Sequence, residues 1–278
     1  MATPLETFTP DAPLVMLGCG KMGGAMLDGW LAKGIDPAAV TVIDPDPSER
    51  LKSLSDERGT VLRGTDPYDG PEPRAVLLAV KPQMMAEALP TVEGPKGGGT
   101  LYVSIAAGTT TAFFQERLGA KTPIVRVMPN TPAAIGRGAS ALFASEACSD
   151  EDRAVARAMT DAVGLSVWIE HEALMDAVTG VSGSGPAYVF HMIEALAAAG
   201  EAAGLPADTA LTLARQTVIG AAALAEETGE SAETLRVNVT SPGGTTEAGL
   251  AVLMGENGLR SLLQQTVQEA KNRSISLR

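Results

Sequence analysis

The chain has 278 residues, 45% of them hydrophobic, which is enough for two domains or for one large domain with an appended helical unit. Its 21 Lys and Arg are outnumbered by 33 Asp and Glu, so a general basic surface is excluded and nucleic acid is not expected as a partner. Two cysteines and two histidines cannot form a metal-ligand cluster at their spacing, so we expect neither a metal site nor a disulfide framework.

The hydropathy pattern argues against a membrane protein. Residues 1–13 contain no positively charged segment followed by an apolar run, and no stretch reaches the roughly 18 uninterrupted apolar residues of a membrane span. We therefore expect a soluble, cytoplasmic protein with no membrane partner.

A glycine-rich turn follows the first apolar run, residues 14–17, and residues 24–32 after it have the pattern of a helix. Glycines at such a turn let the backbone bend sharply and let a pyrophosphate approach without a Cβ in the way, while the helix N-terminus supplies N–H groups and a partial positive charge. The alternative is that these glycines serve only close packing. The strand, turn and helix together predict a dinucleotide cradle, formed by Gly18, Cys19, Gly20, Lys21, Met22 and Gly23.

Asp44 ends the second β-branched run, residues 40–43, about 20 residues after the last glycine of the turn. A carboxylate there accepts a hydrogen bond from the ribose 2′-OH and repels a 2′-phosphate, whereas Arg50 and Lys52 could attract one. The sequence therefore leaves NADPH and NADH both open. Asp44 could instead only cap a turn, since prolines follow it.

Three more apolar runs, residues 75–80, 100–105 and 123–127, stop at small, proline or polar residues. In a doubly wound sheet the ligand lies beyond the carboxyl ends of the strands, so these ends should face the cofactor. The residues expected there are Ala79, Val80, Lys81, Pro82, Ala106, Ala107 and Asn130. For Asn130 a cofactor contact near the nicotinamide and an Asx turn before Pro132 are equally good interpretations.

The second half of the chain is rich in alanine and has helical periodicity. The change predicts two domains, residues 1–170 and 171–278. Pro206 suits the first turn of a helix, and Gly229 suits its end. Alanine and glycine cover more than one face of these helices, which is more apolar surface than a small domain needs for itself. We expect a homodimer, or an assembly of dimers, joined through this helical domain.

An unusual turn, Ser241-Pro-Gly-Gly-Thr-Thr246, separates two of the expected helices. Converging backbone N–H groups at a helix start can hold an organic anion. The alternative is that Thr245 or Thr246 is only an N-cap, although an N-cap would not explain the pair of glycines as well.

The whole pattern resembles the pyrroline-5-carboxylate reductases. The resemblance rests on SGSGPAY at 182–188 and LRVNVTSPGGTTEAGL at 235–250, behind the GCGKMG, AVKP, SIAAG and MPNTP stretches, and it runs from about Leu14 to the last helix. It implies an α/β fold, with an N-terminal Rossmann-type doubly wound sheet and an all-α C-terminal dimerisation domain. It also implies reduction of 1-pyrroline-5-carboxylate to L-proline by NAD(P)H.

The resemblance further implies roles for residues of the turn. Gly243, Gly244, Thr245 and Thr246 would bind the substrate carboxylate, Thr246 would hydrogen-bond the imine nitrogen as the catalytic residue, and Asn238 would lie on the nicotinamide side. A protonated imine needs no strong general acid, so positioning would supply most of the catalysis. The alternatives are another imine or hydroxyacid oxidoreductase, which in the hydroxyacid case would normally need a lysine in the helical domain, and a dinucleotide-sensing protein without turnover.

Overall fold

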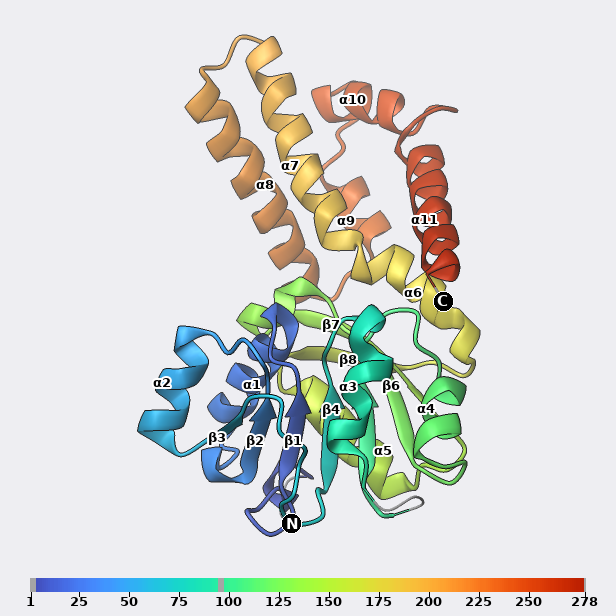
Figure 1. Ribbon diagram of the computed structural model, residues 1–278. Coiled ribbons are helices and arrows are strands. Elements are labelled where there is room, and N and C mark those ends of the chain that lie inside the picture. Colours follow the sequence, from blue (N-terminus) through green and yellow to red (C-terminus); the bar gives the residue numbers. More distant parts are fainter. Residues whose placement is uncertain (1–3, 95–97, 278) are drawn as a thin grey trace. The chain divides into compact units, whose positions relative to one another are not determined.

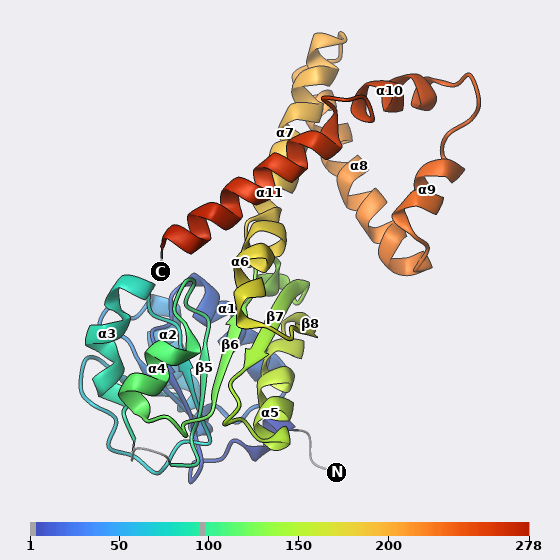
Figure 2. The same cartoon turned by 90° about the vertical axis from the view of Figure 1, so that its right-hand side faces the viewer.

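The computed structural model describes residues 4–94 and 98–277, which form two compact units (Figures 1 and 2). The first unit comprises residues 1–183 and the C-terminal residues 270–278, and the second comprises residues 184–269. The units divide at Gly183, inside the segment that the sequence assigns to the second domain. The boundary near residue 170 stays a prediction about the functional domains.

An eight-stranded sheet, in the order β3-β2-β1-β4-β5-β6-β7-β8, forms the centre of the first unit. All neighbouring strands are parallel except β6 and β7, which are antiparallel. The strands are β1 (Leu14–Leu17), β2 (Val40–Ile43), β3 (Val61–Arg63), β4 (Ala75–Leu78), β5 (Leu101–Ser104), β6 (Ile124–Met128), β7 (Gly138–Ala144) and β8 (Gly164–Trp168). The expected Rossmann-type sheet is confirmed. It extends beyond the strands foreseen from the sequence by β3 at one edge and by β7 and β8 at the other.

Helices cover both faces of this sheet, as Figure 2 shows for α3 and α4 on one side and α5 on the other. The helices of this unit are α1 (Lys21–Ala32), α2 (Glu49–Arg58), α3 (Met85–Ala88), α4 (Thr111–Leu118), α5 (Asp150–Asp161) and α6 (Met175–Val178), which continues into a π-helix at Thr179–Gly183. Short 3-10 turns lie at Pro4–Thr7, Pro37–Ala39, Pro82–Met84, Leu89–Val92, Thr131–Ile135 and Glu172–Leu174. Side chains of successive strand residues point to opposite faces, so the sheet carries one apolar core on each side.

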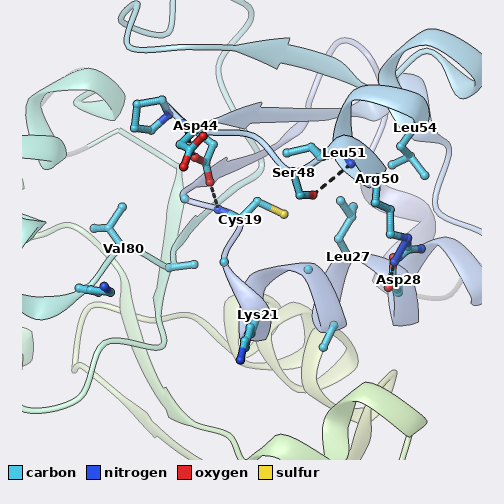
Figure 3. Close-up of a pocket in the computed structure, with 18 of the residues that line it drawn as sticks. Cys19, Lys21, Leu27, Asp28, Asp44, Ser48, Arg50, Leu51, Leu54 and Val80 are labelled. Carbon is cyan, nitrogen blue, oxygen red and sulfur yellow. Dashed lines mark hydrogen bonds and ion pairs between the residues drawn. The ribbon is translucent and has the colours of Figure 1, made fainter.

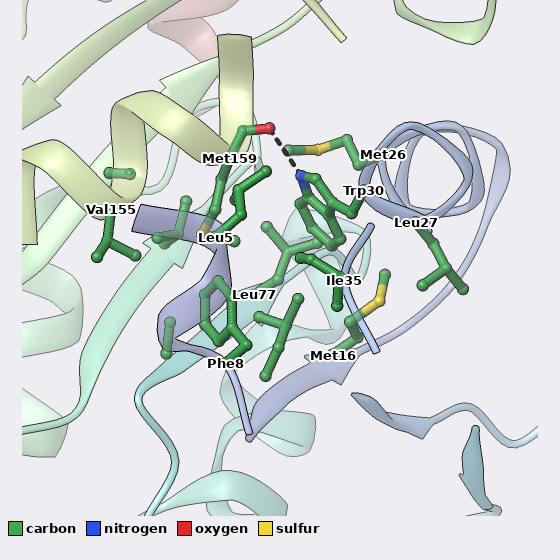
Figure 4. Packing of buried hydrophobic residues seen from close by; sticks show 14 of the residues in the cluster. Leu5, Phe8, Met16, Met26, Leu27, Trp30, Ile35, Leu77, Val155 and Met159 are labelled. Carbon is green, nitrogen blue, oxygen red and sulfur yellow. Dashed lines mark hydrogen bonds between the residues drawn. The ribbon is translucent and has the colours of Figure 1, made fainter. Parts of the chain in front are cut away.

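Trp30 of α1 anchors the larger of these two cores (Figure 4). Its side chain is fully buried, and its indole Nε1–H donates to the backbone oxygen of Met159 in α5 at 2.7 Å. A buried indole N–H needs such a partner, because an unpaired donor in an apolar core is costly. This bond joins α1, the helix that begins at the glycine turn, to α5, which lies more than a hundred residues later in the chain.

Helices make up the second unit: α7 (Gly185–Ala202), α8 (Ala207–Thr228), α9 (Ala232–Asn238), α10 (Thr245–Leu253) and the part of α11 (Leu259–Ser276) before residue 270, from which on the helix belongs to the first unit. The expected end of α8 is confirmed, since Gly229 caps it in the left-handed conformation with φ +64°. None of the described helices is long and apolar enough to cross a membrane.

Large apolar side chains of the second unit are exposed in the single chain. Among residues 184–269 the buried side chains are only Ala197, Ala210 and Ala214, whereas Phe190 is 60% exposed and Val252 is 77% exposed. Three buried alanines cannot supply a core for a unit of this size. The apolar surface of these helices therefore needs a covering partner.

Candidate functional site

A pocket of about 740 Å³ lies at the carboxyl ends of β1, β2 and β4 (Figure 3). Eight of the residues expected to contact a dinucleotide line it: Gly18, Cys19, Gly20, Lys21, Asp44, Ala79, Val80 and Lys81. The pocket also takes Arg50, which the sequence offered as a cation for a 2′-phosphate, and it takes Asp28, Asp46, Ser48 and Met84, which the sequence did not single out as contacts for a bound group. Their order in the chain gives no sign of this grouping, because it depends on how α1 and α2 lie beside the strand ends.

The glycines of the turn have separate structural reasons. Gly18 has φ +84°, and a Cβ there would lie 2.9 Å from Cγ1 of Val80, so no other residue fits without movement. A Cβ on Gly20 would meet nothing within 4 Å, and Gly20 lines the pocket, so the absent side chain leaves space for a bound group. A Cβ on Gly23 would lie 3.2 Å from the backbone oxygen of Gly18, so Gly23 permits close packing of helix on turn.

The first turn of α1 presents unpaired backbone donors beside this space. Gly20 is the N-cap and offers no side chain, and the first intrahelical bond runs from the N–H of Gly24 to the oxygen of Gly20 at 2.8 Å. The N–H groups of Lys21, Met22 and Gly23 therefore precede the helical ladder. Such groups, with the helix dipole, suit a phosphate, so the residues present fit a dinucleotide pyrophosphate.

The carboxylate of Asp44 is held by two backbone groups at the edge of the pocket. Its Oδ2 accepts from the N–H of Cys19 at 2.7 Å, and its Oδ1 accepts from the N–H of Asp46 at 3.0 Å. The second bond is the turn cap that the sequence allowed, and the first ties the end of β2 to the glycine turn. Asp44 therefore caps a turn and also lines the pocket, and its contact with a ribose stays a prediction.

The thiol of Cys19 is unreactive by its surroundings. Its pKa is raised from 9.0 to about 11, because burial is the largest cause and the nearby carboxylates of Asp44 and Asp28 add more than Arg50 removes. At neutral pH such a thiol holds almost no thiolate, and the thiolate is the form that attacks as a nucleophile. Among residues 4–94 and 98–277 no group of three or more His, Cys, Asp and Glu could hold a metal ion.

The glycine–threonine turn at the start of α10 forms a second candidate site. Gly243 has φ +70°, and Gly244 is the N-cap, so neither threonine is the N-cap that the sequence allowed as an alternative. The N–H of Gly243 donates to Oε2 of Glu247 at 2.7 Å, and the N–H of Gly244 donates to the oxygen of Ser241 at 3.0 Å.

The backbone N–H groups without an intrahelical partner at this turn belong to the three residues that follow Gly244. The intrahelical bond from Ala248 to Gly244, at 3.3 Å, is the first of α10, so the N–H groups of Thr245, Thr246 and Glu247 precede the ladder. Thr245 and Thr246 are exposed, and their hydroxyls add two further donors. The turn can thus hold a small anion, while Glu247 fixes the glycine that precedes it.

Comparison with known proteins covers both units. A family model described as pyrroline-5-carboxylate reductase dimerisation matches residues 172–277, and one described as NADP oxidoreductase, coenzyme F420-dependent, matches residues 13–108. The pyrroline-5-carboxylate reductase of Pseudomonas aeruginosa is 37% identical over 277 residues, covering 100% of this chain and 98% of that protein. The chain belongs to the pyrroline-5-carboxylate reductase family.

Other reductases of this family are also similar to this chain over nearly its whole length. The Arabidopsis thaliana reductase is 38% identical over 274 residues, 99% of this chain and 97% of that protein. A solved structure of the Coxiella burnetii reductase has a TM-score of 0.85 at 35% identity, covering 96% of this chain and 98% of that one. A Plasmodium falciparum pyrroline carboxylate reductase solved with NADP bound has a TM-score of 0.80 at 26% identity, covering 96% and 98%. The resemblance to the pyrroline-5-carboxylate reductases is confirmed. The match over residues 13–108 also confirms that the N-terminal domain is of an NADP(H)-binding type.

The remaining residues expected at the cofactor site of this reductase lie outside the lining of the pocket. Met22 is partly buried against the larger core, Ala106 is buried in the smaller one, and Pro82 begins a 3-10 turn that carries Met84 into the pocket. Gly23 and Ala107 also do not line it. Their roles toward a cofactor stay predictions.

Asn130 uses its side chain within the first unit. Its Oδ1 accepts from the N–H of Ala139 in β7 at 2.8 Å, and its Nδ2 donates to the oxygen of Ser182 in the π-helix at 3.1 Å. It makes no capping bond to the turn that follows it, so the alternative of an Asx turn is not what the structure shows. A nicotinamide contact stays a prediction for Asn130, and so does the role of Asn238, an exposed residue that ends α9 in the other unit.

Proposed function

We infer that this protein reduces 1-pyrroline-5-carboxylate to L-proline with NADPH or NADH, the last step of proline biosynthesis. The observation that carries this inference is identity of 37% or more to reductases of this name across essentially the whole chain. Both the dinucleotide-binding unit and the helical unit take part in the match. Shared fold alone would not identify a substrate, but a match of both parts, including the turn before α10, supports one.

We assign cofactor binding to the pocket at the glycine turn and substrate binding to the turn before α10. When bound, the reduced nicotinamide supplies a hydride for the C=N carbon. The free N–H groups of Lys21, Met22 and Gly23 hold the pyrophosphate, and the absent side chain of Gly20 leaves it room. We propose that the other residues expected from the sequence at the cofactor site, including Asp44, also contact the dinucleotide.

The substrate carries a carboxylate beside its imine. The N–H groups of Thr245 and Thr246 and their hydroxyls form a cradle for that carboxylate, with Gly243 and Gly244 shaping the backbone. Hydride addition to a protonated imine gives a neutral amine directly, so the site needs no strong general acid. Thr246 orients the imine nitrogen or relays a proton from water.

The assembly follows from the exposed helices. The family model that covers α7 to α11 is a dimerisation model, and the single chain leaves the large apolar side chains of those helices exposed. We propose a homodimer, or an assembly of dimers, joined through residues 171–278, with residues 1–170 as the dinucleotide domain. A cytoplasmic location stays a prediction from the sequence.

Oxidation of NADPH or NADH on addition of the imine, with L-proline identified by chiral chromatography, tests the activity. Turnover without proline formation would indicate another oxidoreductase. Dinucleotide binding without turnover would indicate a sensing protein. Either result would overturn the proposal.

The variant Thr246→Ala tests the substrate site. It should bind the dinucleotide like the wild type but lose much of kcat, because it removes the hydroxyl that orients the imine. Thr228→Ala is the matched control, since Thr228 is an exposed threonine at the end of α8 with its hydroxyl bonded to its own helix. Wild-type kcat in Thr246→Ala would refute the role of that residue.

A further inference from the structure

The β2–α2 side of the pocket carries more negative than positive charge. Asp44, Asp46 and Arg50 come from this connection, and Asp28 reaches the same side from α1. Three carboxylates thus accompany one guanidinium. The other two cations of the pocket, Lys21 and Lys81, stand at the start of α1 and after β4. In folds of this kind the acid after β2 meets the ribose that carries a 2′-hydroxyl in NADH and a 2′-phosphate in NADPH.

Asp44 cannot turn away from a phosphate at low cost. Both of its oxygens accept backbone N–H groups, from Cys19 at 2.7 Å and from Asp46 at 3.0 Å. Each carboxylate oxygen still has a free lone pair that can accept from a ribose hydroxyl. A 2′-phosphate offers no comparable donor and would bring a second negative charge against this fixed one.

The two cations that could attract a 2′-phosphate are already paired. Arg50 forms an ion pair with Asp28 at the rim of the pocket (Figure 3). Lys52 forms one with Glu49 at 2.7 Å on the exposed face of α2, and it does not line the pocket. A phosphate bound by the remaining donors of Arg50 would therefore also lie close to the carboxylate of Asp28.

The thiol of Cys19, a residue of the glycine turn, lies in the same negative potential. Burial raises the pKa of this thiol most, and the carboxylates of Asp44 and Asp28 raise it further than Arg50 lowers it.

We propose that Asp44, fixed on the glycine turn, and Asp28, paired with Arg50, make this enzyme select NADH over NADPH. The inference rests on the proposed dinucleotide role of the pocket and adds a direction of preference. Asp44 accepts the 2′-hydroxyl of NADH. Asp28 offsets the positive charge of Arg50, so Arg50 neutralises the 2′-phosphate of NADPH less.

The test is calorimetric binding of NADH and NADPH to the full-length protein, with adenosine 5′-monophosphate and adenosine 2′,5′-bisphosphate as the pair that differs only in the 2′-phosphate. NADH should bind at least about tenfold more tightly than NADPH at low salt, with a smaller ratio at high salt because added ions screen the repulsion. The two adenosine nucleotides should show the same order.

Two variants separate the role of Asp44 from that of Asp28. Asp44→Asn keeps an oxygen for the N–H of Cys19 and should narrow the ratio by weakening NADH and strengthening NADPH. Asp28→Asn should release Arg50 and raise NADPH affinity about tenfold with NADH unchanged. Glu57→Gln is the matched control, because it removes one carboxylate from α2 outside the pocket, where Glu57 accepts from the hydroxyl of Ser53 at 2.8 Å, and it should leave the ratio unchanged.

Tighter binding of NADPH than NADH by the wild type would overturn the inference. So would a ratio that neither aspartate variant changes, or that Glu57→Gln changes equally. Those results would leave the reductase activity standing. Failure of both dinucleotides to bind would overturn the proposed function together with the inference.

Discussion

Gly18→Ala tests whether the glycine turn is shaped by steric necessity. An alanine at φ +84° carries a left-handed strain of about 1–2 kcal/mol. Its Cβ would also lie 2.9 Å from Cγ1 of Val80 and 3.2 Å from the carbonyl carbon of Ala79. Forcing these atoms apart costs a further ~1–3 kcal/mol. We expect a total loss of about 2–5 kcal/mol in the free energy of unfolding.

Gly59→Ala is the matched control for this variant. Gly59 has φ +81°, and a Cβ there would meet nothing within 4 Å, so only the strain of about 1–2 kcal/mol applies. Urea unfolding followed by tryptophan fluorescence measures both, since Trp30 and Trp168 both lie in the first unit. Gly18→Ala should also weaken dinucleotide binding, because Ala79 and Val80 line the pocket. Equal destabilisation by the two variants, with cofactor affinity unchanged in Gly18→Ala, would refute the steric account.

Three further changes test the packing, the ion pair and the thiol. Trp30→Phe should lower the free energy of unfolding by about 2–3 kcal/mol, because it removes the bond to Met159 and leaves a void; a loss below the error of urea unfolding would contradict this. Glu172→Gln should cost about 2–4 kcal/mol in the same assay, because it leaves the nearly buried guanidinium of Arg126 without its charge partner at 2.8 Å; a neutral effect would show that the pair is dispensable. The pKa of Cys19 rises from 9.0 to about 11 on folding, so between these pH values the folded state keeps a proton that the unfolded state loses. The free energy of unfolding should therefore fall as the pH rises from 9 towards 11, and Cys19→Ser should reduce this fall. An identical pH profile in the variant would count against the raised pKa.

Local patterns in the sequence were sufficient for much of the first unit. Both β1 and β2 occupy the residues that their apolar runs indicated, since a strand buried on both faces reads as a continuous apolar stretch. β7 was not foreseen, because Gly138–Ala144 is built largely from small residues that carry little strand signal of their own. Its strand conformation depends on pairing with β6 and with β8.

The candidate sites were predictable in position but not in detail. The glycine turn and Asp44 were foreseen because each has a fixed spacing in the chain. The pairing of Asp28 with Arg50 and the bond from Gly243 to Glu247 were not foreseen, because they depend on side-chain directions that only the folded backbone sets. The same holds for Asn130, whose amide joins β7 to the π-helix across the fold.

A crystal structure of the protein grown with L-proline and oxidised dinucleotide tests the central claim most directly. We expect the carboxylate of proline to accept hydrogen bonds from the backbone N–H groups of Thr245 and Thr246, with the dinucleotide pyrophosphate on the first turn of α1. Proline bound away from residues 243–246, with the dinucleotide in place, would contradict the account.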